Sequence, residues 1–464
     1  MLNIITTWIL PLIIVLGAAV TLHEFGHFIV AKILKIRVET FSFGFGPRLI
    51  GKTWGDTDYR ISAIPLGGYV KLGGDESNAP IEGDGAADIP ACERFDLRPR
   101  WQRIAVAVAG PVMNILTALA IPFAAGLIYG VPATPAPIVA SVLQSSAAEE
   151  AGLRPGDRII SFNGTANPDW DTMNDDALLS PNKPLPMTVL RDSQQVDLTI
   201  KPKAFTRDGE TAGELGFIPD YGNVTVFISE VVSGSGADAA GLKAEDKIVA
   251  VGGDQVKSSE QIIQYIRAHK DQPIELDVDR GGQRMHVTAH VPQGQELLGV
   301  KVGQRLPPGP GGPSASLSYA VNQNLRILKL TGKALGQVFT GERSVRNTIS
   351  GPIGIARESS RAVTDFGWAG LFTMLGFLSL NLGIFNLLPI PVLDGGAIFL
   401  LLIEGALAIV GLTISKTVRE RIQQVGFVFV ILLMVFVLTN DALKQISLWR
   451  GGNSNPPANA TPAK

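Results

Sequence analysis

The chain has 464 residues, of which 46% are hydrophobic and 18% charged, and its formal net charge is −2. This length predicts two or more domains, and the mean hydropathy of +0.23 indicates a membrane protein with a substantial soluble part. A near-neutral charge without a basic cluster argues against a nucleic-acid partner. The single cysteine, Cys92, excludes an internal disulfide and a cysteine-based zinc site.

Four apolar segments are long enough to cross a bilayer, at about 4–34, 104–129, 366–388 and 425–438. The first is not expected to be a removed signal peptide, because no small-residue cleavage site follows it. A fifth apolar stretch, 397–412, contains Glu404 and follows a Pro/Gly-rich break. It is predicted to be a re-entrant or membrane-surface helix, with a fifth span as the alternative. The tail is rich in Pro, Ala and Asn and is expected to be disordered.

The segment His23-Glu24-Phe25-Gly26-His27 lies inside the first predicted span. On a helix, His23 and His27 are one turn apart on the same face, so both imidazoles can reach one Zn²⁺. Glu24 lies beside them, where the general base of a zinc hydrolase takes a proton from water. Ionisable side chains are costly in a membrane and indicate function there. Because the chain has only five histidines, a chance match on a solvated helix is the less favoured interpretation.

A second pair, His286 and His290, has the same spacing but lacks the glutamate. The alternating pattern at 284–291 predicts a strand, in which the two histidines are about 13 Å apart. We therefore expect surface histidines there and not metal ligands.

The distribution of Lys and Arg predicts the orientation of the chain. Ten of these residues lie between the first two spans: Lys35, Arg37, Arg48, Lys52, Arg60, Lys71, Arg94, Arg98, Arg100 and Arg103. The positive-inside rule places that loop in the cytoplasm, and Lys416, Arg419 and Arg421 before the last span agree with it. The long region between spans two and three, and both termini, are then expected outside the cytoplasm.

The outer region contains an internal repeat, because AGLRPGDRII at 151–160 is echoed by AGLKAEDKIV at 240–249. A Leu-Gly-apolar step follows each copy, at Leu215-Gly216-Phe217 and Leu298-Gly299-Val300. This order resembles a PDZ domain with permuted strands, in which the Leu-Gly loop takes a C-terminal carboxylate and the next strand pairs with the peptide. Two tandem PDZ-like domains are expected, near 136–219 and 220–303.

A helix is predicted at 259–270 in the second repeat. Its apolar side carries Ile262, Ile263 and Ile266. These residues either wall a peptide groove or belong to the core, and the pattern does not decide between the two.

A catalytic zinc site usually has a third protein ligand, for which Asp394 is the best candidate. Pro389 and Pro391 cannot continue a helix, so the chain must open there at membrane depth. Gly395 and Gly396 let backbone approach closely beside the carboxylate. The alternative is that Asp394 only caps the helix that follows, and spacing alone leaves both interpretations open.

HEFGH in the first span, together with NLLPIPVLDGG at 386–396, resembles the site-2 protease family of intramembrane zinc proteases. AGPVMN at 109–114 matches a further family pattern. FGFGP at 43–47, followed by YRISAIPLGGYVKL at 59–72, is similar to the family's membrane re-entrant β-loop. The tandem PDZ-like insert is similar to the bacterial branch called regulator of sigma-E protease. The resemblance covers nearly the whole chain except the tail.

The resemblance implies a role for each motif residue. It implies Zn²⁺ ligation by His23, His27 and Asp394, with Glu24 as the general base. Substrate contacts are implied for the β-loop at 61–72, which would pair with an unwound substrate strand, and for Asn386, Pro389, Pro391 and Tyr69. For the PDZ-like loops the same role is implied at Leu215, Gly216, Phe217, Leu298, Gly299 and Val300.

The resemblance also implies a substrate class and a location. Substrates would be single-span membrane proteins, such as an anti-sigma factor after a first cut, and remnant signal peptides. The PDZ-like domains would gate substrate entry, either by binding a new C-terminus or by excluding bulky outer domains. The location would be a bacterial inner membrane, with the PDZ-like domains in the periplasm, the active site toward the cytoplasm and a role in the stress response.

The expected fold is a polytopic α-helical membrane protein with a re-entrant β-loop and two tandem periplasmic PDZ-like domains. Its parts are the first span with the zinc motif (1–35), a cytoplasmic membrane-associated segment (36–103), the second span (104–130), the PDZ-like domains (136–219 and 220–303), a linker and amphipathic region (304–365), the third span with a following membrane helix (366–412), the fourth span (422–441) and the tail (451–464).

Two other function classes remain open. A membrane receptor that recruits peptide tails through its PDZ-like domains would tolerate replacement of Glu24. A zinc transporter using the intramembrane His and Asp residues would move metal across vesicle membranes. The pairing of HEFGH with the LDG segment and the repeat favours a protease over both.

Overall fold

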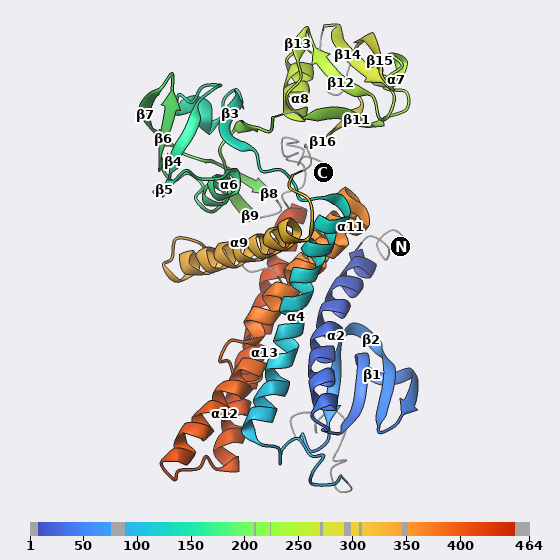
Figure 1. Cartoon of the computed structure of the whole chain (residues 1–464), viewed down its shortest axis with the longest axis vertical. Helices are drawn as coiled ribbons and strands as arrows, with labels where there is room; N and C mark the ends of the chain where they lie inside the picture. The colour runs from blue at the N-terminus through green and yellow to red at the C-terminus, as the bar shows by residue number, and fades with distance from the viewer. Residues whose placement is uncertain are drawn as a thin grey trace. The chain divides into compact units, whose positions relative to one another are not determined.

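The computed structural model describes residues 8–75, 89–207, 210–222, 224–269, 272–291, 298–305, 309–345 and 351–450. The tail predicted to be disordered lies outside these residues. The chain forms two compact units. The membrane unit comprises 1–128, 316–335 and 349–447, and the β unit comprises 129–315, 336–348 and 448–464 (Figure 1).

Within the described residues, four helices are long and apolar enough to cross a membrane, which agrees with the predicted number of spans. They are α2 (Leu10–Ile33), α4 (Arg100–Tyr129), the Phe366–Asn386 part of α11 (Pro352–Asn386), and the Thr417–Lys444 part of α13 (Lys416–Arg450). The backbone of α11 is non-helical at Gly367, next to the start of its span. The last span is longer than predicted because polar residues extend the helix beyond its apolar centre. At 16 residues, α12 (Asp394–Ile409) is not among the four.

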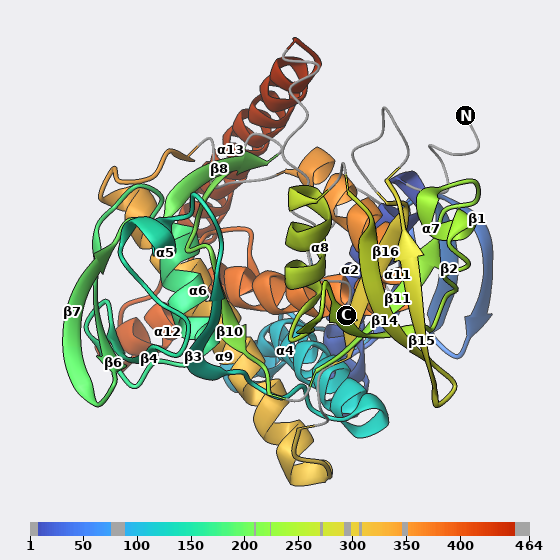
Figure 2. The same ribbon diagram turned by 90° about the horizontal axis from the view of Figure 1, so that it is seen from above.

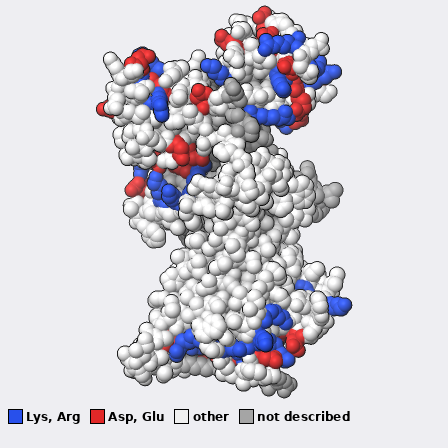
Figure 3. Space-filling view, in the orientation of Figure 1, with Lys and Arg blue, Asp and Glu red and all other residues white. Residues whose placement is uncertain are grey.

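Small residues bring the helices of the membrane unit into close contact. A Cβ at Gly26 of α2 would overlap the backbone of Ala109 on α4, and Gly383 of α11 lies against Pro111 and Asn114 of α4. Inside a bilayer the hydrophobic effect does not drive helices together, so helix association depends on close van der Waals packing. Small residues allow the helix backbones to approach closely enough for it. On the face shown in Figure 3, almost no charged side chains lie between the ends of this unit.

A long antiparallel hairpin follows α2, formed by β1 (Val38–Trp54) and β2 (Thr57–Leu72). Its strands fold back on themselves, so Phe41 pairs with Tyr59 on one side and with Val70 on the other. Gly44 and Gly46 have positive φ where β1 turns, a conformation that favours glycine. The base of the hairpin packs through Val38, Val70 and Leu72 on the end of α2. A β-structure therefore forms where the β-loop was predicted.

The first β domain of the β unit covers 136–220. Its sheet has the order β10-β3-β4-β6-β7, with β5 paired to β4. The elements are β3 (Ala136–Val142), α5 (Ala147–Glu150), β4 (Arg158–Phe162), β5 (Thr165–Ala166), α6 (Trp170–Leu179), β6 (Leu185–Arg191), β7 (Gln194–Ile200) and β10 (Phe217–Asp220). A separate hairpin, β8 (Lys203–Arg207) and β9 (Glu210–Glu214), packs against α6.

The second β domain covers 225–305 and repeats this topology. In the same direction, its sheet order is β16-β11-β12-β14-β15, with β13 paired to β12. The elements are β11 (Thr225–Val231), α7 (Gly236–Ala239), β12 (Lys247–Val251), β13 (Asp254–Gln255), α8 (Ser259–Ala268), β14 (Ile274–Arg280), β15 (Gln283–Ala289) and β16 (Val300–Arg305). Helix α8 packs beside β16 (Figure 2). The remaining long helix, α9 (Pro313–Phe339), contributes residues to both units.

The structure settles two local questions in the second β domain. Ile262 and Ile266 of α8 are buried in the hydrophobic core, so they are core residues and do not wall a groove, whereas Ile263 is half-buried. His286 lies exposed on β15 and His290 lies exposed just past its end. The prediction of surface histidines at this second pair is confirmed.

Candidate metal centre

Three side chains that the sequence analysis singled out meet in the membrane unit. His23 and His27 lie one turn apart on α2, and Asp394 is the first residue of α12. The Nε2 of His23 is 3.0 Å from Oδ2 of Asp394, and the Nε2 of His27 is 3.5 Å from Oδ1 of Asp394. The two Nε2 atoms are 3.2 Å apart. One ligand atom from each residue thus lies within 4.8 Å of the others.

The spacing of these atoms fits one zinc ion. Ligand atoms around a tetrahedral Zn²⁺ with bonds of about 2.0–2.2 Å lie about 3.3 Å apart. Both histidines are buried, at 5% and 8% exposure, and the Asp394 side chain is 22% exposed. Two imidazoles and one carboxylate form a donor set used by catalytic zinc sites, in which a fourth position stays open.

Asp394 is directed at the histidines and not at the end of its own helix. Leu393 is the N-cap of α12, and its side chain makes no capping hydrogen bond. Asp394 lies in the first turn, with its carboxylate oxygens facing His23 and His27. A Cβ at Gly395 or Gly396 would overlap the backbone of the preceding turn, so this tight loop requires glycine.

Glu24 lies next to His23 on α2 and contacts the β-hairpin. Its Oε2 accepts a hydrogen bond of 3.0 Å from the backbone N–H of Val70 on β2. The segment of β2 around Val70 therefore runs directly past the glutamate. The sequence analysis missed this contact, because a backbone amide leaves no residue-specific signal.

The other predicted substrate contacts of the membrane unit lie near this group. Asn386 ends α11, and its Nδ2 is 3.2 Å from Nε2 of His23. Pro389 and Pro391 lie in the non-helical turn between α11 and α12. Tyr69 precedes Val70 on β2, and its ring stacks on Phe45 with centroids 6.2 Å apart.

Helix α4 lines the far side of the two imidazoles. The Nδ1 of His27 is 2.7 Å from the carbonyl oxygen of Val106, and the Nδ1 of His23 is 3.3 Å from Nδ2 of Asn114. A Cβ at Gly110 would overlap both rings. The sequence analysis noted the segment containing Asn114 but assigned no role to it.

Comparison with known proteins agrees with this geometry. The model of Peptidase family M50 matches residues 11–433. The chain belongs to this family. It is 33% identical over 454 residues to a putative zinc metalloprotease of Vibrio cholerae, and 34% identical over 455 residues to the regulator of sigma-E protease RseP of Salmonella typhimurium. It is also 32% identical over 456 residues to regulator of sigma-E protease RseP of Escherichia coli. Each alignment covers 92% of this chain and 97% of the relative.

These findings confirm the predicted resemblance to site-2 proteases. Membership of family M50 supports a metalloprotease, and the four apolar helices agree with a membrane-embedded one. The matched range contains HEFGH, the LDG segment and both β domains.

The Leu-Gly steps occupy equivalent positions in the two β domains of this chain. Gly216 and Gly299 have φ of 77° and 84°, and a Cβ at either would overlap Ser146 or Ser235, respectively. Three neighbouring side chains predicted as peptide contacts, Leu215, Phe217 and Leu298, are instead at most 5% exposed and belong to the two cores. They are buried because each packs among the apolar side chains of its own domain core.

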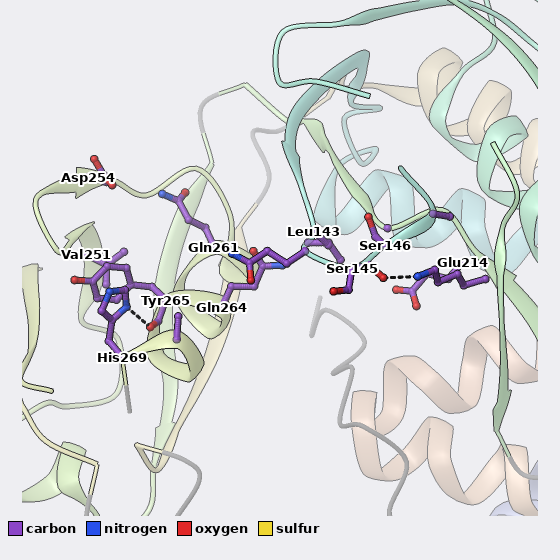
Figure 4. A pocket seen from close by; sticks show the side chains of 15 residues that line it. Leu143, Ser145, Ser146, Glu214, Val251, Asp254, Gln261, Gln264, Tyr265 and His269 are labelled. Carbon is purple, nitrogen blue, oxygen red and sulfur yellow. Dashed lines mark hydrogen bonds between the residues drawn. The ribbon is translucent and has the colours of Figure 1, made fainter. Parts of the chain in front are cut away.

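The Leu-Gly loop of the first β domain opens on a hollow of about 710 Å³ (Figure 4). Ser145, Ser146 and Gly216 line it on one side. Gln261 and Tyr265 of α8 in the second β domain line the other. Polar side chains and apolar ones such as Leu143 and Val251 both contribute to its walls.

Proposed function

We propose that this chain is an intramembrane zinc metalloprotease that cleaves a peptide bond within the transmembrane segment of a single-span protein. One observation carries the proposal. His23, His27 and Asp394 bring their ligand atoms within 4.8 Å of one another among apolar helices, and Glu24 lies beside them on the same helix turn. Intramembrane ionisable groups are costly, so such a cluster is functional by default.

Zn²⁺ would be held by His23, His27 and Asp394. Bound there, it supplies Lewis acidity toward the scissile carbonyl and activates water for attack. The Glu24 carboxylate would accept a proton from the attacking water and donate it to the leaving amine. The hydrogen bond from the Val70 amide fixes the Glu24 carboxylate, so the base does not have to be oriented during the reaction.

The substrate must be extended before it is cut, because a helical peptide bond is shielded by its own turn. The β2 segment at 68–72 lies beside Glu24 and offers strand backbone next to the base. A substrate strand aligned along it would pass the metal centre. The Asn386 amide reaches the same point from α11, and Pro389 and Pro391 keep the turn after it open.

The membrane unit has the charge distribution of an oriented membrane protein. Its Lys and Arg side chains gather at the end where α4 begins, which is also the side where α2 ends (Figure 3). By the positive-inside rule this end faces the cytoplasm, and the long chain segment between the second and third spans is then periplasmic. Two bacterial relatives are named regulator of sigma-E protease, and we propose by analogy a bacterial inner membrane as the location and an anti-sigma factor as one substrate.

The two β domains act as PDZ-like gates for substrate. The repeated topology and the positive-φ glycines in equivalent loops support this assignment. A new C-terminus would bind to the loop backbone, or bulky outer domains would be excluded by size. Since Leu215 and Leu298 are core residues, a charge at either would unfold a domain. Substitutions at half-buried Gln261 or Lys203, which line the hollow, are the better probes of substrate choice.

The proposal is tested by cleavage of a single-span substrate without its outer domain, using purified protein in detergent. Wild type should cleave, lose activity with a zinc chelator and regain it with Zn²⁺. Glu24→Gln should retain zinc while cleavage falls about 10²–10⁴-fold, the contribution of a general base. His286→Ala, at the second histidine pair, should leave both unchanged.

Three outcomes would contradict the proposal. Wild-type turnover by Glu24→Gln would exclude that residue as the base. Zinc binding without cleavage of any single-span substrate would favour a membrane receptor. Metal flux across vesicles that is independent of Glu24 would favour a zinc transporter.

A further inference from the structure

We infer that Asn114 is a positioning residue for His23, whose Nδ1–H it binds through its side-chain oxygen so that Nε2 faces the metal. This inference rests on the proposed zinc site. It assigns a role to a buried side chain on α4 that contacts neither substrate nor metal. Partners of this kind fix the ring orientation and the tautomer of a metal-binding histidine.

One face of α4 is built around the two imidazoles. Val106, Gly110 and Asn114 are spaced by four residues, so they stack on one side of the helix. The Val106 carbonyl lies at His27, Asn114 lies at His23, and the missing side chain of Gly110 leaves room for both rings. The three residues together form the wall against which both histidines rest.

The proton on His27 is fixed by its partner. Its Nδ1 is 2.7 Å from the Val106 carbonyl oxygen, which can only accept a hydrogen bond. Nδ1 therefore carries the proton, and the lone pair of neutral His27 is on Nε2, which faces Asp394.

The same reasoning applies to His23. Its Nε2 lies 3.0 Å from Asp394 and 3.2 Å from Nε2 of His27, so Nε2 is its metal-facing atom. Neutral His23 must then carry its proton on Nδ1, and whatever faces Nδ1 must accept a hydrogen bond. The atom of Asn114 that can do so is the amide oxygen.

The side-chain oxygen of Asn114 makes no other hydrogen bond among the described residues. Its side chain is completely buried, and its Oδ1 has no hydrogen-bond partner among the described residues. The amide oxygen and nitrogen of asparagine are assigned from the hydrogen-bond network, since their shapes are nearly identical. With Nδ2 toward His23, two N–H groups would face each other. Turning the amide by 180° places Oδ1 there instead, where it accepts a hydrogen bond from the Nδ1–H of His23.

Asn324 shows what a purely structural buried asparagine does in the same unit. Its Nδ2 donates to the carbonyl oxygens of Ala118 and Ala320 and so joins α9 to α4. Asn114 makes no such bond to a backbone carbonyl among the described residues, while Gly383 packs against its Cβ. The hydrogen bond to His23 is therefore what distinguishes Asn114.

The test measures zinc affinity by chelator competition in full-length protein, independently of cleavage. Asn114→Leu removes the acceptor at similar volume and should weaken zinc binding about 10–100-fold, as loss of such a partner does. Asn114→Asp keeps an oxygen toward Nδ1–H and should bind zinc within a few-fold of wild type. Asn324→Leu, the matched buried control, should leave the affinity unchanged. Visible spectra of Co²⁺-loaded protein should change in Asn114→Leu and remain near wild type in Asn114→Asp.

Zinc binding by Asn114→Leu as tight as wild type would overturn the inference, and so would an Asn114→Asp affinity as weak as that of Asn114→Leu. If wild type binds no zinc, the proposed function fails instead, so the two failures are distinguishable. Nitrogen NMR of histidine-labelled wild type needs no variant that must fold, and the chain has only five histidines to assign. Protonated Nδ1 on both His23 and His27 with zinc bound is expected; Nδ1 coordination by His23 would contradict the inference.

Discussion

Carboxylates of the two units have chemically different partners. In the β unit, Asp157 is 1% exposed, and it accepts hydrogen bonds of 2.7 and 2.6 Å from Arg191 and one of 2.8 Å from the Arg154 amide. The second β domain repeats this arrangement, with Asp246, Arg280 and the Lys243 amide in the same positions. These acids are fully matched by a guanidinium and a backbone donor, so their role is structural.

Asp394 of the membrane unit has no arginine beside it among the described residues. Its oxygens face only the imidazole nitrogens of His23 and His27, which are ligands for a cation when neutral. The chemistry of the partner distinguishes these acids: a guanidinium neutralises the carboxylate, whereas neutral imidazoles leave its charge available to a metal.

The largest expected effect comes from removing the carboxylate of Asp394. Asp394→Ala removes a ligand, so zinc binding should be lost and cleavage should fall by more than about 100-fold, beyond the effect of losing an outer partner. The unfolding of the β domains should not change. Metal analysis, the cleavage assay and hydrogen exchange on the same preparation measure all three. Retention of stoichiometric zinc would place the third ligand elsewhere.

Asp157→Ala should produce the reverse pattern. It removes the carboxylate partner of Arg191 and should destabilise the first β domain by about 3 kcal/mol, the low end for breaking a buried pair, because the Arg191 side chain is 19% exposed and also donates to the Gly152 carbonyl. Hydrogen exchange in peptides from 136–220 of the full chain should accelerate, while zinc content stays constant. Asp246→Ala is the matched change for the second domain. If either variant accelerated hydrogen exchange equally in both domains, the two ion pairs would not stabilise their domains independently.

The paired acids also predict how the β unit responds to acid. Burial alone would raise the pKa of Asp157, but the hydrogen bonds from Arg191 and the Arg154 amide outweigh it and lower that pKa below the usual value of 3.8. The pKa of Asp246 is lowered in the same way by Arg280 and the Lys243 amide. A lowered folded pKa contributes stability that is complete above the unfolded pKa and is lost as pH falls through the folded one.

Urea unfolding of the β domains, followed by hydrogen exchange, should therefore show constant stability between about pH 5 and 7 and a decline below about pH 4. The double variant Asp157→Asn, Asp246→Asn should be less stable at neutral pH and should show a shallower acid decline. An equally steep decline in the double variant would assign the acid sensitivity to other carboxylates.

The smallest predicted effect concerns helix caps that differ between the domains. Ser258 caps α8, and Asp169 caps α6, each accepting a bond from a backbone N–H of the first turn. Ser258→Ala and Asp169→Ala should each cost about 1 kcal/mol in their own domain only. Local hydrogen exchange of α8 and α6 measures this; a change in zinc affinity from either variant would show coupling between the units that this account does not contain.

Much of the fold was predictable because its signals are local or repeated. Apolar runs gave the four spans, and the repeated AGL segment indicated two domains of like topology. The meeting of HEFGH with the LDG segment followed from the ligand number of zinc and from family resemblance. The β8–β9 hairpin was not predicted, because it belongs to the first domain alone and no repeat signals it.

The surroundings of the site could not be read from the sequence. The Val70 amide and the Val106 carbonyl act through backbone, which every residue shares, so nothing in the letters marks them. Asn114 is a side chain, but its use depends on the packing of α4 against α2, which spacing within one helix does not reveal. Leu215 and Leu298 were placed at a binding surface because their neighbouring glycines are there, while their own side chains turn into the cores.

The central claim is that His23, His27 and Asp394 hold one catalytic zinc ion inside the membrane unit. X-ray absorption spectroscopy of purified, zinc-loaded protein tests it most directly. The account predicts one zinc per chain with two imidazole nitrogens and oxygen ligands at about 2.0–2.2 Å, and loss of one imidazole in His23→Ala. No bound zinc in active protein, or a zinc whose imidazole count is the same in His23→Ala, would contradict it.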